Sequence, residues 1–424
     1  MPIEEKDDNR IKGILYSCQK FFSKLAVFFI IYTLILAVGY SYSVRNKYSI
    51  TFTITLVFIL SLTILAQYLF SITYKLYLQA DQKIYITNLI TTGTLVVNTI
   101  IAFVVIKVFP EIRILKLLSS IAFFVQPFIY RRFIPSEFTE YKKNKSTGVV
   151  LKNRWSGFAQ NLAHYVNMNT DIVLITLFCS LTDVSIYSVY LLGINAIRSI
   201  ISYVTNSYQS ALGKYIAQGD SGRLNDNFRI FCIYTWATCL ILYCTCLLVV
   251  NPFVSIYTNN VNDANYYQPI FALIIVLANL IYCLREPYRL LILAGGKFKE
   301  TNFGSIMEAV LNLGISIILI RPFGLTGVAI GTLVAISYRM VYFIIFLRKG
   351  MLDIRFRDYS RYVVVGGIVV AINIVVYFSL NFQIESLIRF FMCGMVVAIL
   401  ESFLVGTFFL GPKTTILMIK KFLK

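Results

Sequence analysis

Ionisable side chains inside apolar stretches are the residues of this sequence that could do chemistry. His164 and Asp171 occur in the stretch 157–180, and their spacing of seven residues, about two helical turns, puts both on one helix face. Because an aspartate in hydrocarbon costs on the order of 3 kcal/mol on insertion scales, it should face water or a partner. Asp171 and His164 are therefore candidates for binding a coupling proton or sodium ion, and the neighbouring Asn169 for lining a polar pathway. Helix packing is the alternative reading for both Asp171 and His164.

A second polar face is predicted in the apolar stretch 301–320. Glu308 and Asn312 are four residues apart, so on a helix they are neighbours on one side. That pair suits ion coordination by Glu308 and cargo contact by Asn312, or hydrogen bonds across helices. Shortly upstream, Pro287 predicts a kink in the span 268–292, because proline breaks the helical hydrogen-bond ladder.

Four arginines also lie within apolar spans. One is Arg289, and the other three, Arg198, Arg285 and Arg339, are candidate site residues. A cation at that depth suits an anionic substrate in an aqueous pathway, and we assign all three to the substrate pathway. Two alternatives remain open at this point. Arg198 could form a buried pair with Asp171 or Glu308, and Arg285 could reach the headgroups along its own stem.

The composition predicts an all-α, polytopic membrane protein. The chain is 58% hydrophobic and 14% charged, whereas soluble chains carry about a quarter charged residues. Apolar runs of about 20 residues recur along the whole length, and helices satisfy their backbone groups internally in lipid. We place about twelve transmembrane helices, at 22–42, 50–71, 84–107, 114–131, 157–180, 184–212, 229–250, 268–292, 301–320, 324–347, 361–380 and 385–410.

The basic residues that give the net charge of +19 lie mainly in the loops between these spans. Most of the 39 Lys and Arg fall on one side of the membrane when both termini are placed in the cytoplasm, in agreement with the positive-inside rule. The charge therefore anchors the topology and faces membrane lipids, and no nucleic-acid partner is indicated. Motifs of soluble catalysis are absent from the sequence, and the eight Cys lack metal-ligand spacing, so we expect no enzyme, catalytic residue, metal or cofactor.

The basic run 132–156 divides the chain into two bundles. The predicted organisation has five parts: a cytoplasmic amphipathic segment at 1–21, an N-terminal lobe of four helices at 22–131, the basic cytoplasmic linker at 132–156, a C-terminal lobe of six helices at 157–347, and an extra helix pair with a basic tail at 348–424.

One hairpin of the sequence is repeated. Residues 74–101 match residues 288–315 without a gap, and the matches include Tyr, Lys, Thr and two Asn. Internal repeats of this kind are typical of transporter lobes. The repeated hairpin holds equivalent places in two six-helix lobes only if two helices precede residue 22, so we expect that the first lobe lacks its first two helices.

Three stretches resemble the bacterial polysaccharide repeat-unit flippases, the Wzx-like O-antigen and capsule transporters, of the superfamily that includes the MATE exporters. They are KNRWSGFAQNLAHYVNMNTDIVLIT at 152–176, YRLLILAGGKFKETNFGSIMEAVLNLGISIILIRPFGLTGVAIGT at 288–332, and SITYKLYLQADQKIYITNLI at 71–90. The resemblance implies two MATE-like lobes around a central cavity, followed here by a C-terminal helix pair. It also implies a location in the bacterial inner (plasma) membrane.

The resemblance further implies that the chain flips undecaprenyl-diphosphate-linked oligosaccharide repeat units during O-antigen, capsule or exopolysaccharide biosynthesis. A polysaccharide polymerase and glycosyltransferases are then expected as partners. A cation-coupled drug or metabolite antiporter and an inactive truncated homologue are the alternatives. Arginine matches or outnumbers the acids inside the spans, which favours an anionic cargo over cationic drugs.

Overall fold

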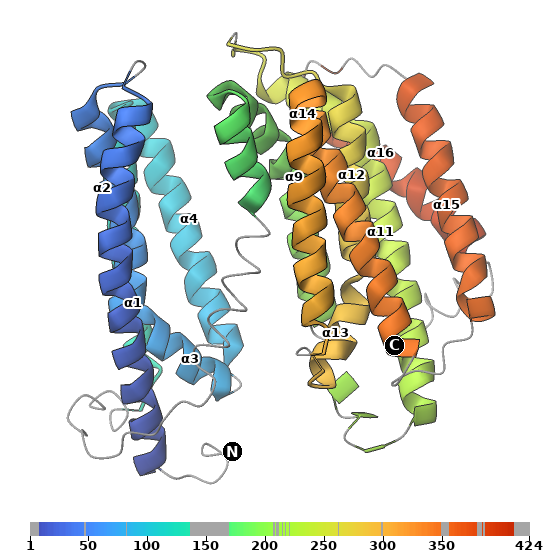
Figure 1. The fold of residues 1–424 in the computed structure, drawn as a ribbon, viewed down its shortest axis with the longest axis horizontal. Helices are drawn as coiled ribbons and strands as arrows, with labels where there is room; N and C mark the ends of the chain where they lie inside the picture. Colours follow the sequence, from blue (N-terminus) through green and yellow to red (C-terminus); the bar gives the residue numbers. More distant parts are fainter. Residues whose placement is uncertain are drawn as a thin grey trace. The chain divides into compact units, whose positions relative to one another are not determined.

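The computed structural model is helical, and no strand occurs among the residues that it describes. These residues are 8–45, 48–81, 83–135, 169–206, 221–261, 263–297, 300–348, 356–379 and 386–410, with 384 and a few positions between 208 and 219. By chain contacts they fall into two compact units, residues 1–159 and 160–424, and each unit is described by itself (Figure 1).

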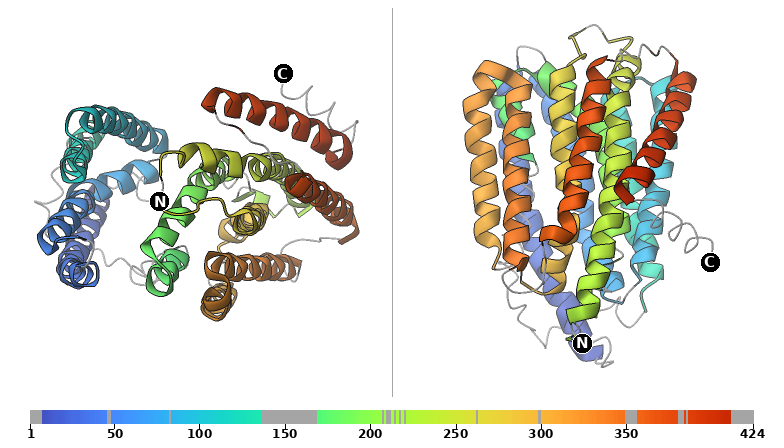
Figure 2. Two further views of the ribbon diagram at one scale, coloured as in Figure 1. Left: turned by 90° about the horizontal axis from the view of Figure 1, so that it is seen from above. Right: turned by 90° about the vertical axis from the view of Figure 1, so that its right-hand side faces the viewer.

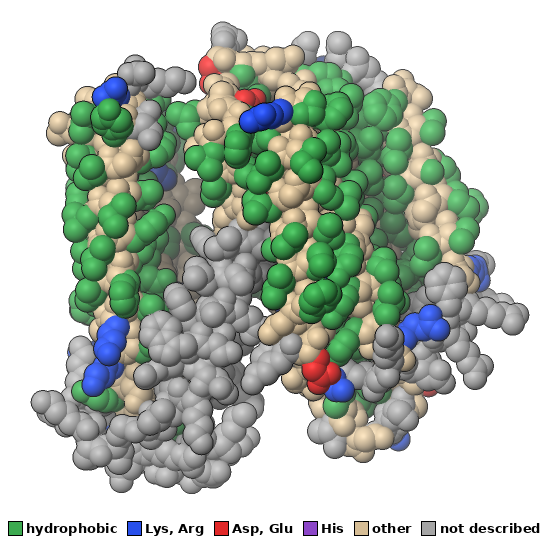
Figure 3. Space-filling view, in the orientation of Figure 1, with side chains coloured by type: hydrophobic (Ala, Val, Ile, Leu, Met, Phe, Trp, Pro, Cys, Tyr) green, Lys and Arg blue, Asp and Glu red, His purple; other side chains and the backbone are tan. Residues whose placement is uncertain are grey.

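Within the described residues, ten helices are long and apolar enough to cross a membrane. One of them, α14 (Asn302–Arg348), contains two of the predicted spans, and a shorter apolar helix at Asn169–Phe178 belongs to the predicted span 157–180. The expected fold class, an all-α polytopic membrane protein, is thereby confirmed. Figure 3 shows hydrophobic side chains over the middle of the visible face, with most charged side chains towards its two ends.

The first unit consists of helices from the N-terminal third of the chain. They are α1 (Asp8–Ser43), α2 (Ile50–Ala66), the π-helical turn η1 (Gln67–Ser71), α3 (Ile72–Ala80), α4 (Ile84–Val108), α5 (Ile112–Phe124) and α6 (Gln126–Arg132). A polar contact joins α2 to α5, where Thr63 donates to Ser120 at 3.0 Å. Another joins α1 to α3, where Thr73 donates to Gln19 at 2.7 Å.

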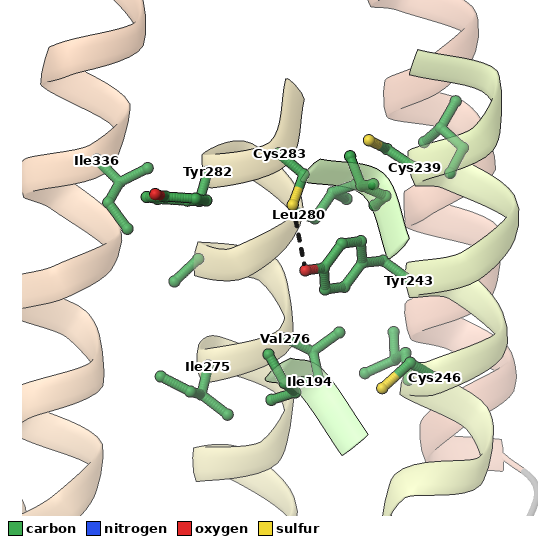
Figure 4. Packing of buried hydrophobic residues seen from close by; sticks show 14 of the residues in the cluster. Ile194, Cys239, Tyr243, Cys246, Ile275, Val276, Leu280, Tyr282, Cys283 and Ile336 are labelled. Carbon is green, nitrogen blue, oxygen red and sulfur yellow. Dashed lines mark hydrogen bonds between the residues drawn. The ribbon is translucent and has the colours of Figure 1, made fainter. Parts of the chain in front are cut away.

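The second unit has the larger core. Its elements are the helix Asn169–Phe178, α9 (Leu181–Asn206), α11 (Ser221–Tyr257), α12 (Pro269–Leu284), α13 (Glu286–Ala294), α14, α15 (Phe356–Ser379), α16 (Leu387–Leu404) and the π-helical turn η3 (Val405–Leu410). Helices α11 and α12 pack together through buried side chains such as Tyr243 and Cys283, whose hydroxyl and sulfur are 3.3 Å apart (Figure 4).

Helix α14 is a hairpin of two limbs. Gly324 has φ 53° and ψ −129°, a conformation that only glycine adopts readily, and the chain reverses there. Figures 1 and 2 show the two orange limbs joined at one end. The limbs approach closely because Gly327 and Gly331 have no side chain: a Cβ on Gly327 would meet the Leu319 carbonyl, and one on Gly331 would meet Ser316 Oγ.

The repeated hairpin has the same local structure in both units. In the first copy the short helix α3 is followed by a turn and the long helix α4. In the second copy the short helix α13 is followed by a turn and the first limb of α14. The next reversal also corresponds, because α4 ends at Val108 and Gly324 lies at the matching place in the second copy. The sequence repeat is therefore a structural repeat.

Candidate substrate and ion site in the second unit

Asp171 is buried among neutral hydrogen-bond donors. Its carboxylate accepts from Thr332 at 2.7 Å, from Tyr187 at 3.0 Å and from Asn312 at 3.3 Å. Only 5% of its surface is exposed. These donors come from α9 and from both limbs of α14, so one carboxylate connects three separate segments. No ion pair to Asp171 occurs within the described part of the chain.

Other oxygens surround this carboxylate. Asn312 Oδ1 accepts from Ser316 at 3.2 Å and from Thr332 at 3.3 Å, and Ser316 Oγ lies 3.4 Å from the Val328 carbonyl oxygen. Carboxylate, amide, hydroxyl and carbonyl oxygens are the ligands that small hard cations prefer. The cluster of Asp171, Asn312, Ser316, Val328 and Thr332, called the oxygen cluster below, is therefore suited to a proton or a small hard cation.

The close approach at Gly331 holds the oxygen cluster together, and this gives a first prediction. In Gly331→Ala, the new Cβ would meet Ser316 Oγ and lie 2.9 Å from the Ser316 nitrogen. We expect the limbs to separate and the stability to fall by roughly 1–3 kcal/mol, as for overpacking elsewhere. The thermal unfolding midpoint of the purified protein measures the change. Gly314→Ala, on the first limb of α14, is the matched control, because a Cβ there meets nothing within 4 Å; an equal loss in both variants would contradict this account.

Glu308 lies between two arginines. Its carboxylate pairs with Arg285 at 2.5 Å and with Arg339 at 3.6 Å, and all three residues are buried. Arg339 also donates to the Thr301 carbonyl at 3.0 Å and to Ser305 Oγ at 2.6 Å. Two cations thus share one anion, and the group keeps a net positive charge inside the bundle.

Tyr282 connects the third arginine to this group. The guanidinium carbons of Arg198 and Arg285 lie 3.8 Å and 4.4 Å from the centre of its ring, within range of cation–π attraction. Arg285 Nε is buried and has no hydrogen-bond partner within the described residues. Arg198 is the more accessible arginine, since its side chain is half-buried.

The kink that Pro287 predicts occurs two residues earlier in the chain, at Arg285. Helix α12 ends at Leu284, Arg285 forms the junction, and α13 begins at Glu286 with Pro287 in its first turn. The junction places Arg285 against Glu308, whereas Arg289 pairs with Glu286 at 2.7 Å and is about one third exposed. Arg289, and not the buried Arg285, is therefore the arginine whose side chain can extend toward the headgroups.

The structure thus brings most of the predicted site residues into two adjacent groups, and each group includes side chains of α14. Asn312 belongs to the oxygen cluster with Asp171, and Glu308, one turn away, belongs to the arginine group. Asn169 lies half-buried two residues before Asp171. His164 lies outside the described residues. Sequence reasoning missed Tyr187, Ser316, Val328 and Thr332; Ser316 could have been found from its spacing of four residues after Asn312.

These features define a class, an α-helical membrane protein with two buried polar groups in one of its units. No protein-family model and none of the curated proteins matches the chain. Among solved structures, the chain is similar to the lipid II flippase MurJ in its inward closed conformation. The TM-score is 0.65, the match covers 95% of this chain and 90% of that one, and the sequence identity is 14%. At this identity the likeness is one of fold alone.

Proposed function

We propose that the chain flips lipid-linked oligosaccharide across the bacterial inner membrane, with undecaprenyl-diphosphate-linked repeat units of O-antigen, capsule or exopolysaccharide as cargo. The observation that carries the proposal is the arginine group around Tyr282 and Glu308, in a fold similar to that of a lipid II flippase. Both termini are cytoplasmic in this proposal, and the glycosyltransferases and polymerase that handle the same glycan are the expected partners.

The charge of the cargo explains the arginines. A diphosphate cannot cross hydrocarbon unaided, because a bare anion there lacks both water and counter-charge. In this proposal Arg198 meets the diphosphate first, since it is the more accessible member of the group. Arg285 and Arg339 are held by Glu308 and supply a fixed positive field, so the diphosphate meets an excess of positive charge at little reorganisation cost.

The oxygen cluster supplies the coupling ion site in this proposal. Glu308 is already neutralised by two arginines, whereas Asp171 has only neutral donors, so Asp171 is the better place for a proton or sodium ion. A cation on Asp171 would draw both limbs of α14 and α9 to one centre. Binding and release would thereby bias the lobes between two orientations, as alternating access requires.

A cation-coupled drug or metabolite antiporter is the second candidate. The buried carboxylate of Asp171, with no cationic partner in the described residues, is the observation that favours it. The two candidates differ in what they ask of Arg198: a cationic drug is repelled by that guanidinium, whereas a diphosphate is attracted.

Reconstitution into proteoliposomes tests the proposal. We expect fluorescent polyprenyl-diphosphate oligosaccharide to cross in the presence of the protein, and Arg198→Ala to slow that crossing about tenfold, a loss of about 1.4 kcal/mol. The matched control is Arg321→Ala, which removes an exposed arginine near the α14 turn and should leave the rate unchanged. If lipid-linked glycan does not cross while a cationic dye does, and Arg198→Ala speeds the dye, the antiporter is the better account.

A further inference from the structure

Another buried carboxyl group lies far along the chain from both polar groups. Glu401 of α16 is 6% exposed and lies eight residues before the end of the apolar span Leu387–Phe409. Its hydrogen-bond partner within the described residues is Asn373 of α15, whose Nδ2 donates to Glu401 Oε2 at 3.3 Å. Asn373 is itself 2% exposed, and the same Nδ2 also bonds the Val369 carbonyl at 3.1 Å.

The helices around Glu401 offer it no cation. Helix α16 packs against α11 and η3, and η3 packs against α15. The charged residues of α11 are Arg223, Asp226 and Arg229, in its first three turns. Those of α15 are Arg357, Asp358 and Arg361, in its first two turns. The other charged residue of α16 is the exposed Arg389, in its first turn. The titratable group of α11 that interacts with Glu401 is the Cys244 thiol, which is uncharged. Segment η3 carries no charged residue.

A charged carboxylate in this place would be poorly compensated. One long hydrogen bond from a neutral amide does not replace the water that an ion loses on burial, and in such cases the group usually takes up a proton instead. A neutral carboxyl group loses much less than a carboxylate on burial, and one of its oxygens accepts the hydrogen bond that Asn373 donates. Its other oxygen then carries the proton.

We infer that Glu401 is a proton-binding site of the C-terminal helix pair, separate from the oxygen cluster, and that its protonated form holds α16 against α15 through Asn373. Two turns from Asn373, α15 also approaches α11 and η3: a Cβ on Gly366 would lie 3.5 Å from both Leu240 of α11 and Phe409 of η3. Figure 2 shows α15 and α16 as the red helices.

The inference gives the helix pair a response to pH. Helix α15 is held at its end by Tyr377, which donates to the Pro269 carbonyl at 2.8 Å and accepts from Asn251 at 2.6 Å. When Glu401 loses its proton to water, the bare carboxylate favours hydration over burial, and α16 is the helix that moves away. Low pH therefore keeps the pair closed, and alkaline pH opens it.

Infrared difference spectroscopy on the full chain in lipid nanodiscs tests the protonation directly. We expect wild type minus Glu401→Gln to show the carbonyl stretch of a protonated carboxyl group near neutral pH. Glu300→Gln is the matched control; that glutamate is 57% exposed, so its difference spectrum should contain only carboxylate bands. Carboxylate bands alone for Glu401 at neutral pH would overturn the inference.

A second test begins with chemical labelling of the wild-type protein. A membrane-permeant carbodiimide reacts with protonated carboxyl groups in apolar surroundings, so wild-type protein should be labelled at Glu401 near neutral pH and progressively less as the solution becomes alkaline. The rate of backbone hydrogen exchange in α16 should also rise as the pH becomes alkaline, by more than base catalysis of exchange alone explains. Glu401→Gln should remove this additional rise. Labelling and exchange that are both insensitive to pH would overturn the role in helix contact.

Discussion

Asp171→Asn is expected to slow glycan flipping about 100-fold while the protein remains folded. Asparagine keeps the shape of the side chain and still accepts hydrogen bonds from Tyr187 and Thr332, but it brings no negative charge to a bound cation. Removing one partner of a buried, desolvated charge pair costs about 2–5 kcal/mol, and about 2.8 kcal/mol is 100-fold in rate or affinity. The proteoliposome assay, run across a gradient of protons or of sodium ions, measures the loss.

Asp183→Asn is the control for that variant. Asp183 is near in sequence but has a capping role: its carboxylate accepts from the Ser180 nitrogen at 3.0 Å and from Ser180 Oγ at 2.7 Å, and its own nitrogen donates back to Ser180 Oγ. We expect it to lower stability slightly and leave ion dependence intact. Normal flipping by Asp171→Asn at normal protein level would remove Asp171 from the coupling role.

Glu308→Ala is expected to be the most destabilising single change in the arginine group. It leaves Arg285 and Arg339 buried beside one another without the anion that pairs with both. Breaking a buried pair by removing one partner costs about 3–5 kcal/mol, and here two cations lose the same partner. The thermal unfolding midpoint and the yield of monodisperse protein in detergent should both fall.

Removal of one arginine should be tolerated better than removal of the acid. Arg339→Met leaves Arg285 and Glu308 as a one-to-one pair at 2.5 Å, so the buried charge becomes balanced, although the bonds to Thr301 and Ser305 are lost. The double variant Glu308→Ala/Arg339→Met should recover part of the stability that Glu308→Ala loses. If Arg339→Met is as unstable as Glu308→Ala and the double variant recovers nothing, charge balance does not govern this group.

Helical periodicity and apolar length predicted the element type well, because each span has to satisfy its own backbone in lipid. The ends were harder to place. Helix α1 begins at Asp8 rather than near residue 22, and α11 extends to Tyr257 through Pro252, because polar and proline-containing turns continued helices that hydropathy alone would end. The repeat was the more informative signal, since it matched the turn between α3 and α4 with that between α13 and α14.

The members of the site were predicted individually, but their partners were not. Asp171 and Asn312 were both candidates, yet their contact joins residues 141 positions apart and depends on how the helix Asn169–Phe178 packs on α14. The contact of Asn312 with Thr332 was more accessible to prediction, because the two flank the reversal at Gly324. Tyr187 and Tyr282 gave no signal, since an aromatic residue on a membrane helix is ordinary core.

The structural repeat bears on how such a chain could have evolved. Duplication of one hairpin yields two copies of the same backbone structure, and only one copy needs to keep the ionisable side chains. Asn98 of α4 corresponds to Asn312, but Thr94, bonded to its own helix at the Ile90 carbonyl at 2.8 Å, stands where the other copy has Glu308. After duplication, one descendant hairpin was thus free to gain or lose ionisable side chains while its sister preserved the ancestral architecture.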